Sequence, residues 1–271
     1  MKPALNPYLD RIMSLIGEKS PERALQAFVA AKSGANESLD SLAYKLGVSR
    51  IIEQKMPFEG GLFRLAHGEL VIKLNIDSPF VRKRFTLAHE IGHLFLETVP
   101  ALRSTRRLDA ALERTCDLIA AELLMPTAAA SDFVRGLGPP SPEKLREIAS
   151  KYRVSLQTAA IRVRDGLKIW KCSMGMWAAS PKSKTLWFTG LRRWQYAQPS
   201  LECVELALNS NASVCTVDRW ERADFTERVW LNLLRVGSSC VLGLVDSAKD
   251  SKLQKTHTRS FQGQAPRAAN F

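Results

Sequence analysis

The stretch His89-Glu90-Ile91-Gly92-His93 constrains this chain more than any other feature of its sequence. Asp77-Ser78-Pro79 supplies a cap and a first-turn proline, so the pattern predicts a helix from Pro79 to Glu97. Side chains four positions apart on a helix have Cβ atoms about 5–6 Å apart, which lets two imidazoles bind one metal ion with bonds of about 2.0–2.1 Å. Glu90, rotated by about 100° from the first histidine, can face a water on that ion. The motif is typical of metal-assisted hydrolysis.

Apolar residues lie nearly all round this predicted helix, which indicates that the helix is buried. They are Phe85, Leu87, Ala88, Ile91, Gly92, Leu94, Phe95 and Leu96. The alternative to a metal site is a pair of core histidines with ordinary hydrogen-bond partners. One zinc ion satisfies both imidazoles and leaves Glu90 a water to bind, whereas the alternative needs a separate partner for each buried group. We therefore favour a zinc site.

A catalytic zinc ion commonly has three protein ligands, so a third is expected on a neighbouring element. Apolar residues from Leu108 to Met125 form one helical stripe that ends before Pro126, and Cys116, which lies on this stripe, is expected in the core. Three carboxylates recur at every fourth position of this predicted helix, namely Asp109, Glu113 and Asp117. Like charges at this spacing are mildly destabilising in a bare helix, and a cation beside Glu113 would relieve the repulsion.

Glu113 is the preferred third ligand because it lies at the border of the apolar stripe. Its rival Glu122 projects about 180° away, into the middle of the predicted polar face. The alternative is a solvated acidic face on which Arg114 pairs with Asp117. The two remaining histidines, His67 in a turn-like segment and His257 in a polar tail, are expected to be solvated.

The chain resembles the ImmA/IrrE-type metallopeptidase family in two blocks of sequence. The first is Arg84-Phe85-Thr86-Leu87-Ala88-His89-Glu90-Ile91-Gly92-His93. The second comprises Glu113-Arg114-Thr115-Cys116-Asp117 and Ala120-Ala121-Glu122-Leu123-Leu124-Met125-Pro126. The resemblance covers about residues 36 to 165 and is far more specific than the zinc motif alone.

The resemblance implies a cytoplasmic, zincin-like peptidase that cleaves a helix-turn-helix repressor and so relieves repression in a stress or mobile-element response. By position, His89, His93 and Glu113 would be the zinc ligands, with Mn²⁺ able to replace Zn²⁺ in vitro, and Glu90 the general base. Asp117 would orient a liganding histidine through its other ring nitrogen.

In the mechanism that these roles imply, Glu90 takes a proton from a zinc-activated water and later passes it to the leaving amine. A second donor besides zinc would stabilise the oxyanion. No free histidine is available for this role outside the tail, so Tyr152 and Tyr196 are the candidates, and the sequence does not choose between them.

Composition narrows the class of protein further. The chain has 271 residues and 45% hydrophobic content, enough for one large or two modest domains. No apolar run approaches the roughly 18 residues of a membrane span and the N-terminus lacks the hydrophobic stretch of a signal peptide, so we expect a cytoplasmic protein without membrane contact. The five cysteines contain no Cys-x-x-Cys pair, which favours reduced thiols. The formal charge of +12 allows contact with nucleic acid or an acidic partner.

The sequence predicts an α+β protein with five parts. They are an N-terminal helical lead-in (1–35), a zincin-like metallopeptidase domain built from the active-site helix and a small sheet (36–135), a helix-turn-helix-like segment (140–166), a C-terminal α/β domain (167–246) and a disordered basic tail (247–271). The lead-in is expected to contain two short helices, divided near residues 17–21.

Two of these parts suggest further functions. Arginines 146, 153, 162 and 164 on the helix-turn-helix-like segment could bind DNA, although in the resembled family this segment packs against the peptidase.

All six tryptophans fall between residues 170 and 230, alongside strand-like runs at 185–188 and 214–217. Some relatives carry a GAF-like sensory domain here, and the alternative is that the tryptophans are simply the core of a small domain.

The leading hypothesis is therefore a zinc metalloendopeptidase whose partner is a helix-turn-helix repressor. Two rivals remain open. One is a DNA-binding regulator whose peptidase site is unused, and the other is a partner-binding scaffold, for example of a toxin-antitoxin pair.

Overall fold

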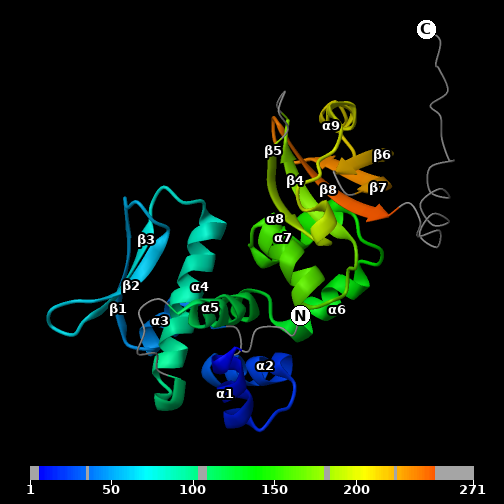
Figure 1. The fold of residues 1–271 in the computed structure, drawn as a ribbon. Helices are drawn as coiled ribbons and strands as arrows, with labels where there is room; N and C mark the ends of the chain where they lie inside the picture. The colour runs from blue at the N-terminus through cyan, green and yellow to red at the C-terminus, as the bar shows by residue number, and fades with distance from the viewer. Residues whose placement is uncertain (1–5, 35–36, 103–108, 180–183, 223–224, 248–271) are drawn as a thin grey trace, which may run out of the picture. The chain divides into compact units, whose positions relative to one another are not determined.

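Helices and strands of the chain divide into two units, both shown in Figure 1. The computed structural model describes residues 6–34, 37–102, 109–179, 184–222 and 225–247. Within them, the first unit contains residues up to 138 together with 147–169, and the second contains 139–146 together with the residues from 170 on. The predicted tail lies outside the described residues except for Ser247.

The first unit begins with the two helices that the sequence predicts. Helix α1 (Pro7–Ile16) is capped by Asn6, whose side chain accepts from two backbone N–H groups, and it ends at Gly17 with φ +75°. Helix α2 (Pro21–Lys32) is capped by Ser20. Their buried side chains, such as Ile12 and Phe28, belong to the same hydrophobic core as those of the histidine-bearing helix.

A three-stranded sheet follows α3 (Leu39–Lys45). Its strands are β1 (Val48–Gln54), β2 (Gly60–Arg64) and β3 (Leu70–Asn75), in the order β1-β3-β2. β1 is parallel to β3 and β2 is antiparallel to it, so β2 is an edge strand. The predicted strand at residues 70–74 is confirmed.

Helix α4 (Phe80–Glu97) carries the two histidines, and its predicted extent is confirmed to within one residue. The predicted cap is wrong, because Pro79 occupies the N-cap position and no side chain caps the helix. The Ser78 hydroxyl instead donates to Glu59, 2.5 Å away, and is therefore engaged elsewhere.

Helix α5 (Ala110–Leu124) packs against α4, and α4 also contacts β2 and β3. Figure 1 shows α4 running beside the small sheet with α5 across it. Ile91 and Phe95 of α4 meet Cys116 and Ile119 of α5, and all four side chains are fully buried. Asp109 is the N-cap of α5, where its carboxylate accepts from two backbone N–H groups. Leu108, the predicted first residue of this helix, lies outside the described residues.

The prediction that Glu122 lies in the middle of a polar face is wrong, because Glu122 is only 7% exposed. Its carboxylate pairs with the Arg162 guanidinium and accepts from the Thr127 backbone N–H and hydroxyl. Arg162 also donates to the Met125 carbonyl oxygen at 2.8 Å. The helical period was read correctly, but the face opposite the apolar stripe is covered by another part of the chain.

The predicted helix pair after residue 140 is confirmed as α7 (Pro142–Tyr152) and α8 (Leu156–Ile161), preceded by α6 (Thr127–Gly136). Arg153 lies in the turn between α7 and α8 with φ +51°. A short π-helix, η2 (Arg162–Gly166), continues α8. Because Arg162 is 7% exposed and holds Glu122, it is not available to DNA as the sequence suggested.

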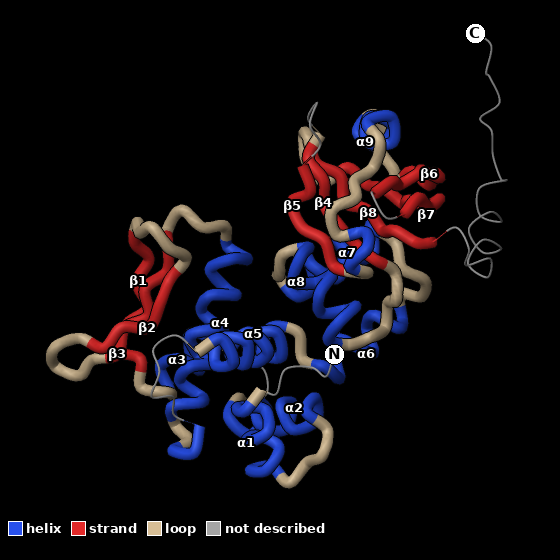
Figure 2. Tube along the Cα trace, viewed as in Figure 1, coloured by secondary structure: helices blue, strands red, loops and turns tan. Residues whose placement is uncertain are grey.

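The second unit is built on a five-stranded sheet with the order β5-β4-β8-β7-β6. The strands are β4 (Ser173–Ala178), β5 (Lys184–Thr189), β6 (Val214–Arg222), β7 (Phe225–Arg235) and β8 (Cys240–Ser247). Both strand-like runs named from the sequence are confirmed. All pairings are antiparallel, so this unit is α+β, and the expectation of an α/β domain is wrong. Helix α9 (Leu201–Leu208) contacts three of the strands, beside which it lies in Figure 2.

Three tryptophans form the centre of this unit. Trp177, Trp194 and Trp220 are at most 2% exposed, and their rings meet edge to face at 6.0 and 6.2 Å. Trp230, by contrast, is 38% exposed. The interpretation of the tryptophans as the core of a small domain therefore holds for these three of the six.

No helix in the described part of the chain is long and apolar enough to cross a membrane.

Candidate metal centre

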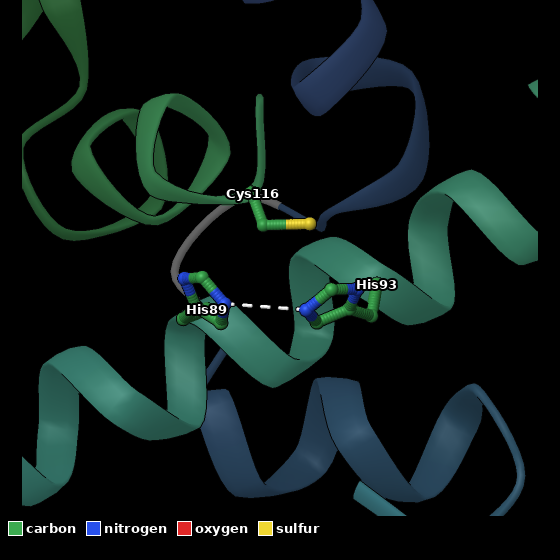
Figure 3. A group of neighbouring side chains, drawn as sticks. All are labelled: His89, His93 and Cys116. Carbon is green, nitrogen blue, oxygen red and sulfur yellow. Dashed lines mark hydrogen bonds between the residues drawn. The ribbon is translucent and has the colours of Figure 1, made fainter. Parts of the chain in front are cut away.

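The spacing of the motif places both imidazoles on one face of α4. The Nε2 atoms of His89 and His93 lie 3.2 Å apart, and the rings meet edge to face with centroids 5.0 Å apart, as Figure 3 shows. The side chains are 16% and 20% exposed, so they can still be reached from solvent.

Glu113 of α5 completes a triangle with these two nitrogens. One carboxylate oxygen lies 3.1 Å from Nε2 of His89 and the other lies 3.5 Å from Nε2 of His93. Ligands of a tetrahedral zinc ion with bonds of about 2.0–2.1 Å lie about 3.3 Å from one another. The three observed separations match this value, so the donor set fits a zinc-sized ion without rearrangement.

Asp117 determines how His89 is protonated. Its carboxylate lies 2.9 Å from Nδ1 of His89, and because a carboxylate only accepts, Nδ1 carries the proton. The neutral ring then turns the lone pair of Nε2 toward Glu113, which is also an acceptor. Two facing acceptors need a cation or a proton between them. Either a metal ion or a proton on Nε2 meets this need, so the contact is compatible with a metal ion.

Electrostatics at the two rings differ. Burial opposes the imidazolium form of His89, but the hydrogen bond that its Nδ1–H donates to Asp117 and the charges of Glu90, Asp117 and Glu113 outweigh burial and raise its pKa. Burial and the neighbouring His89 lower the pKa of His93. These opposite shifts favour the neutral, metal-binding form more strongly at His93 than at His89.

Glu90 lies beside the pair on the same helix and is 8% exposed. Burial raises the pKa of its carboxyl, opposed by the charge of His89 and by a hydrogen bond from the backbone N–H of Leu62 on β2. The raised pKa suits a group that must accept and later release a proton near neutral pH. Glu90 thus stands between the histidines and the edge strand.

Cys116 is the residue near the site that the sequence indicated only as core. Its Sγ and a nitrogen of each histidine all lie within 4.8 Å of one another. Burial raises the pKa of this thiol well above its usual range, and the charges of Glu113, Glu90 and Asp117 raise it further. A protonated thiol is a poor ligand, so Glu113 is the better third donor for zinc. Only the packing of α4 against α5 shows that this thiol lies beside the two histidines.

The two tyrosines named from the sequence are placed differently. Tyr152 packs edge to face on Phe133 of α6, with ring centroids 6.1 Å apart, and its buried hydroxyl has no hydrogen-bond partner among the described residues. Tyr196 belongs to the second unit and is 74% exposed. His67 is exposed as expected, and His257 lies outside the described residues.

Asp117→Ala is expected to lower zinc affinity by about 10- to 100-fold, because His89 would lose the partner that fixes its tautomer and orientation. A chelator competition assay on the metal-free protein measures this change. Asp117→Asn keeps an oxygen acceptor and should lose less. The matched control is Asp132→Ala on α6, whose side chain is 86% exposed, and which should bind zinc as the parent does.

Two imidazoles and a carboxylate around one point, with a buried glutamate beside them, define a candidate mononuclear metal centre of the hydrolytic class. A family model described as the IrrE N-terminal-like domain, of the Peptidase M78 family, matches residues 43–164. Residues 43–164 thus match the model of this peptidase family, and the resemblance seen in the sequence is confirmed.

Two curated relatives agree with this assignment. The radiation response metalloprotease IrrE of Deinococcus radiodurans is 32% identical over 167 residues, which cover 58% of this chain and 49% of that protein. The protein of the same name from Deinococcus deserti is 36% identical over 96 residues, which cover 33% and 34%. The chain thus spans half or less of the length of these relatives.

One solved structure supports the fold over nearly the whole chain. A transcriptional regulator of Mycobacterium tuberculosis superposes with a TM-score of 0.51 at 11% identity, covering 95% of this chain and 86% of that one. At this level of identity the similarity concerns the fold alone.

Proposed function

We propose that this protein is a zinc-dependent metalloendopeptidase. The observation that carries the proposal is the convergence of His89, His93 and Glu113 at 3.1 to 3.5 Å, with Glu90 buried beside them. A zinc ion held by these three side chains would supply an activated water and would polarise the scissile carbonyl. Manganese could replace it in vitro.

The residues of the site have separate roles in this reaction. Glu90 takes the proton from the attacking water and passes it to the leaving amine. Asp117 holds His89 with its proton on Nδ1, so that Nε2 faces the metal. Tyr152 and Tyr196 remain the candidate oxyanion donors that the sequence offers, and neither gains support from its contacts.

The edge strand β2 suits an extended peptide as substrate. Leu62 donates its backbone N–H to Glu90, so the unpaired edge of β2 faces the base. A peptide that adds to this edge by backbone hydrogen bonds would pass beside Glu90. This arrangement supports cleavage of a protein within an unfolded or loop segment.

The protein substrate we propose is a helix-turn-helix repressor in the cytoplasm, whose cleavage relieves repression in a stress or mobile-element response. The names of the relatives, radiation response metalloproteases, support a stress response. In this proposal the small sheet with α4 and α5 is the zincin-like domain, and the five-stranded unit is a GAF-like sensory domain. The burial of Arg162 removes one of the four arginines that favoured DNA binding.

The test mixes the purified full chain, zinc or manganese, and the repressor encoded beside it. Glu90→Gln should slow cleavage by at least about 100-fold, because the amide cannot accept the proton. A gel assay of repressor fragments measures the rate, and zinc content should be unchanged in the variant. Equal cleavage by both proteins would remove Glu90 from the mechanism. Bound partner without cleavage, with metal present, would favour the scaffold instead.

A further inference from the structure

Cys116 lies on α5, the same helix as Glu113, and its sulfur atom lies near the two histidines of α4. Its Sγ and the ring nitrogens of His89 and His93 lie within 4.8 Å of one another, and Figure 3 shows the thiol of α5 next to both rings. Nitrogen and sulfur ligands of one tetrahedral ion, with bonds of about 2.0–2.1 and 2.3 Å, lie about 3.6 Å apart. Binding would therefore require Sγ and the two nitrogens to move closer together around the ion.

Gly92 explains why the thiol comes so close. A Cβ atom on Gly92 would lie 3.1 Å from Cα and 3.2 Å from the carbonyl oxygen of Cys116, which is tighter than ordinary contact. The backbones of α4 and α5 therefore nearly touch at this point. The thiol is held by the contact of two core helices, because Cys116 itself is fully buried.

The site thus offers two donors of different chemistry to one pair of imidazoles. Glu113 supplies oxygen and Cys116, three residues later on α5, supplies sulfur. Zinc accepts either kind of donor, whereas soft cations prefer thiolate. We propose that Cys116 is a ligand recruited by soft divalent cations, for which Cd²⁺ is the probe, to the His89 and His93 pair.

The chemistry involves no change of oxidation state. The S–H bond breaks, a Cd–S bond forms, and the proton leaves to solvent. If Glu113 stays bound, the cation has four protein ligands, the number typical of closed structural sites. Soft cations would therefore block the position that water needs. The inference rests on the metal centre of the proposed function.

The experiment titrates metal-free full-length protein with Cd²⁺ and follows thiolate-to-metal absorption in the ultraviolet together with proton release. Cys215 is exposed and Cys240 partly exposed, so both are first replaced by serine. In this background Cys116→Ser should lose the absorption and lower the affinity for Cd²⁺ relative to Zn²⁺ at least about tenfold. The matched control is Cys203→Ser, a buried cysteine of the second unit, which should behave as the background.

Two outcomes separate this inference from the proposed function. In the first, the parent protein binds zinc, His93→Ala weakens zinc binding, and Cys116→Ser keeps the Cd²⁺ absorption. The thiol is then not a ligand, and only this inference fails. If His93→Ala binds zinc as tightly as the parent, the metal centre itself is wrong, and both fail. Cys116→Ala repeats the measurement without a buried hydroxyl, with thermal unfolding as the check of folding.

Discussion

Replacing Arg162 with methionine is expected to destabilise the first unit by about 3–5 kcal/mol. Both members of the Glu122–Arg162 pair are 7% exposed, so removing one leaves a buried charge without its counter-ion. Arg162 also donates to the Met125 carbonyl oxygen and to the Thr127 hydroxyl, at 2.8 and 2.9 Å. The variant therefore removes the Arg162 donors from the Met125 carbonyl oxygen and the counter-ion from the Glu122 carboxylate.

Chemical denaturation followed by far-ultraviolet circular dichroism measures this loss. The double variant Glu122→Leu with Arg162→Met removes both charges, and should be much more stable than the sum of the two single losses predicts. The matched control is Arg135→Met, since Arg135 lies on α6 with its side chain 67% exposed, and its loss should stay within about 0.5 kcal/mol. A single variant as stable as the parent would show that the pair contributes little.

The pair also shows where prediction from the sequence stops. Helical periodicity placed His89, His93 and Glu113 on facing stripes, and the structure brings these three together. The same periodicity placed Glu122 on the opposite face of α5, but it cannot tell whether solvent or another segment covers that face. Arg162 covers it from 40 residues away, a separation at which no local pattern acts.

Cys116 illustrates the same limit at the metal centre. Its place on the apolar stripe predicted burial, and burial is correct. Its distance from the histidines depends on how closely α4 and α5 approach, which the absent side chain of Gly92 permits. Gly92 alone is a weak signal, because a glycine within a helix has several explanations.

In the second unit, strand positions were predictable and their arrangement was not. Alternating β-branched and aromatic residues predicted strands near 185–188 and 214–217. Sheet order depends on long-range pairing, such as β4 with β8, whose registered residues lie more than 60 positions apart. The short segments between β4 and β5, and between β7 and β8, are compatible with antiparallel pairs, and this signal could have corrected the α/β expectation.

Trp177→Ala is expected to destabilise the second unit by about 3–5 kcal/mol, because it removes the largest fully buried side chain at the centre of the core. The indole of Trp177 lies over Gly175 and Gly243, which face each other across β4 and β8. A Cβ on Gly243 would lie 2.7 Å from the Trp177 ring and 2.6 Å from Cδ2 of Leu233. These glycines therefore provide the space that the ring fills.

This fit can be tested by a double-mutant cycle on Trp177 and Gly243. Gly243→Ala alone should cost about 1–3 kcal/mol, since the rigid ring cannot move aside. In the Trp177→Ala background the added methyl group no longer meets the ring and only the flexible end of Leu233 must shift, so the second substitution should cost less. Denaturation followed by fluorescence reports on this unit selectively, because all six tryptophans lie between residues 170 and 230. Trp230→Ala is the control, with a smaller loss expected from a residue that is 38% exposed. Additive losses for Trp177 and Gly243 would mean that the ring and the glycine do not depend on each other.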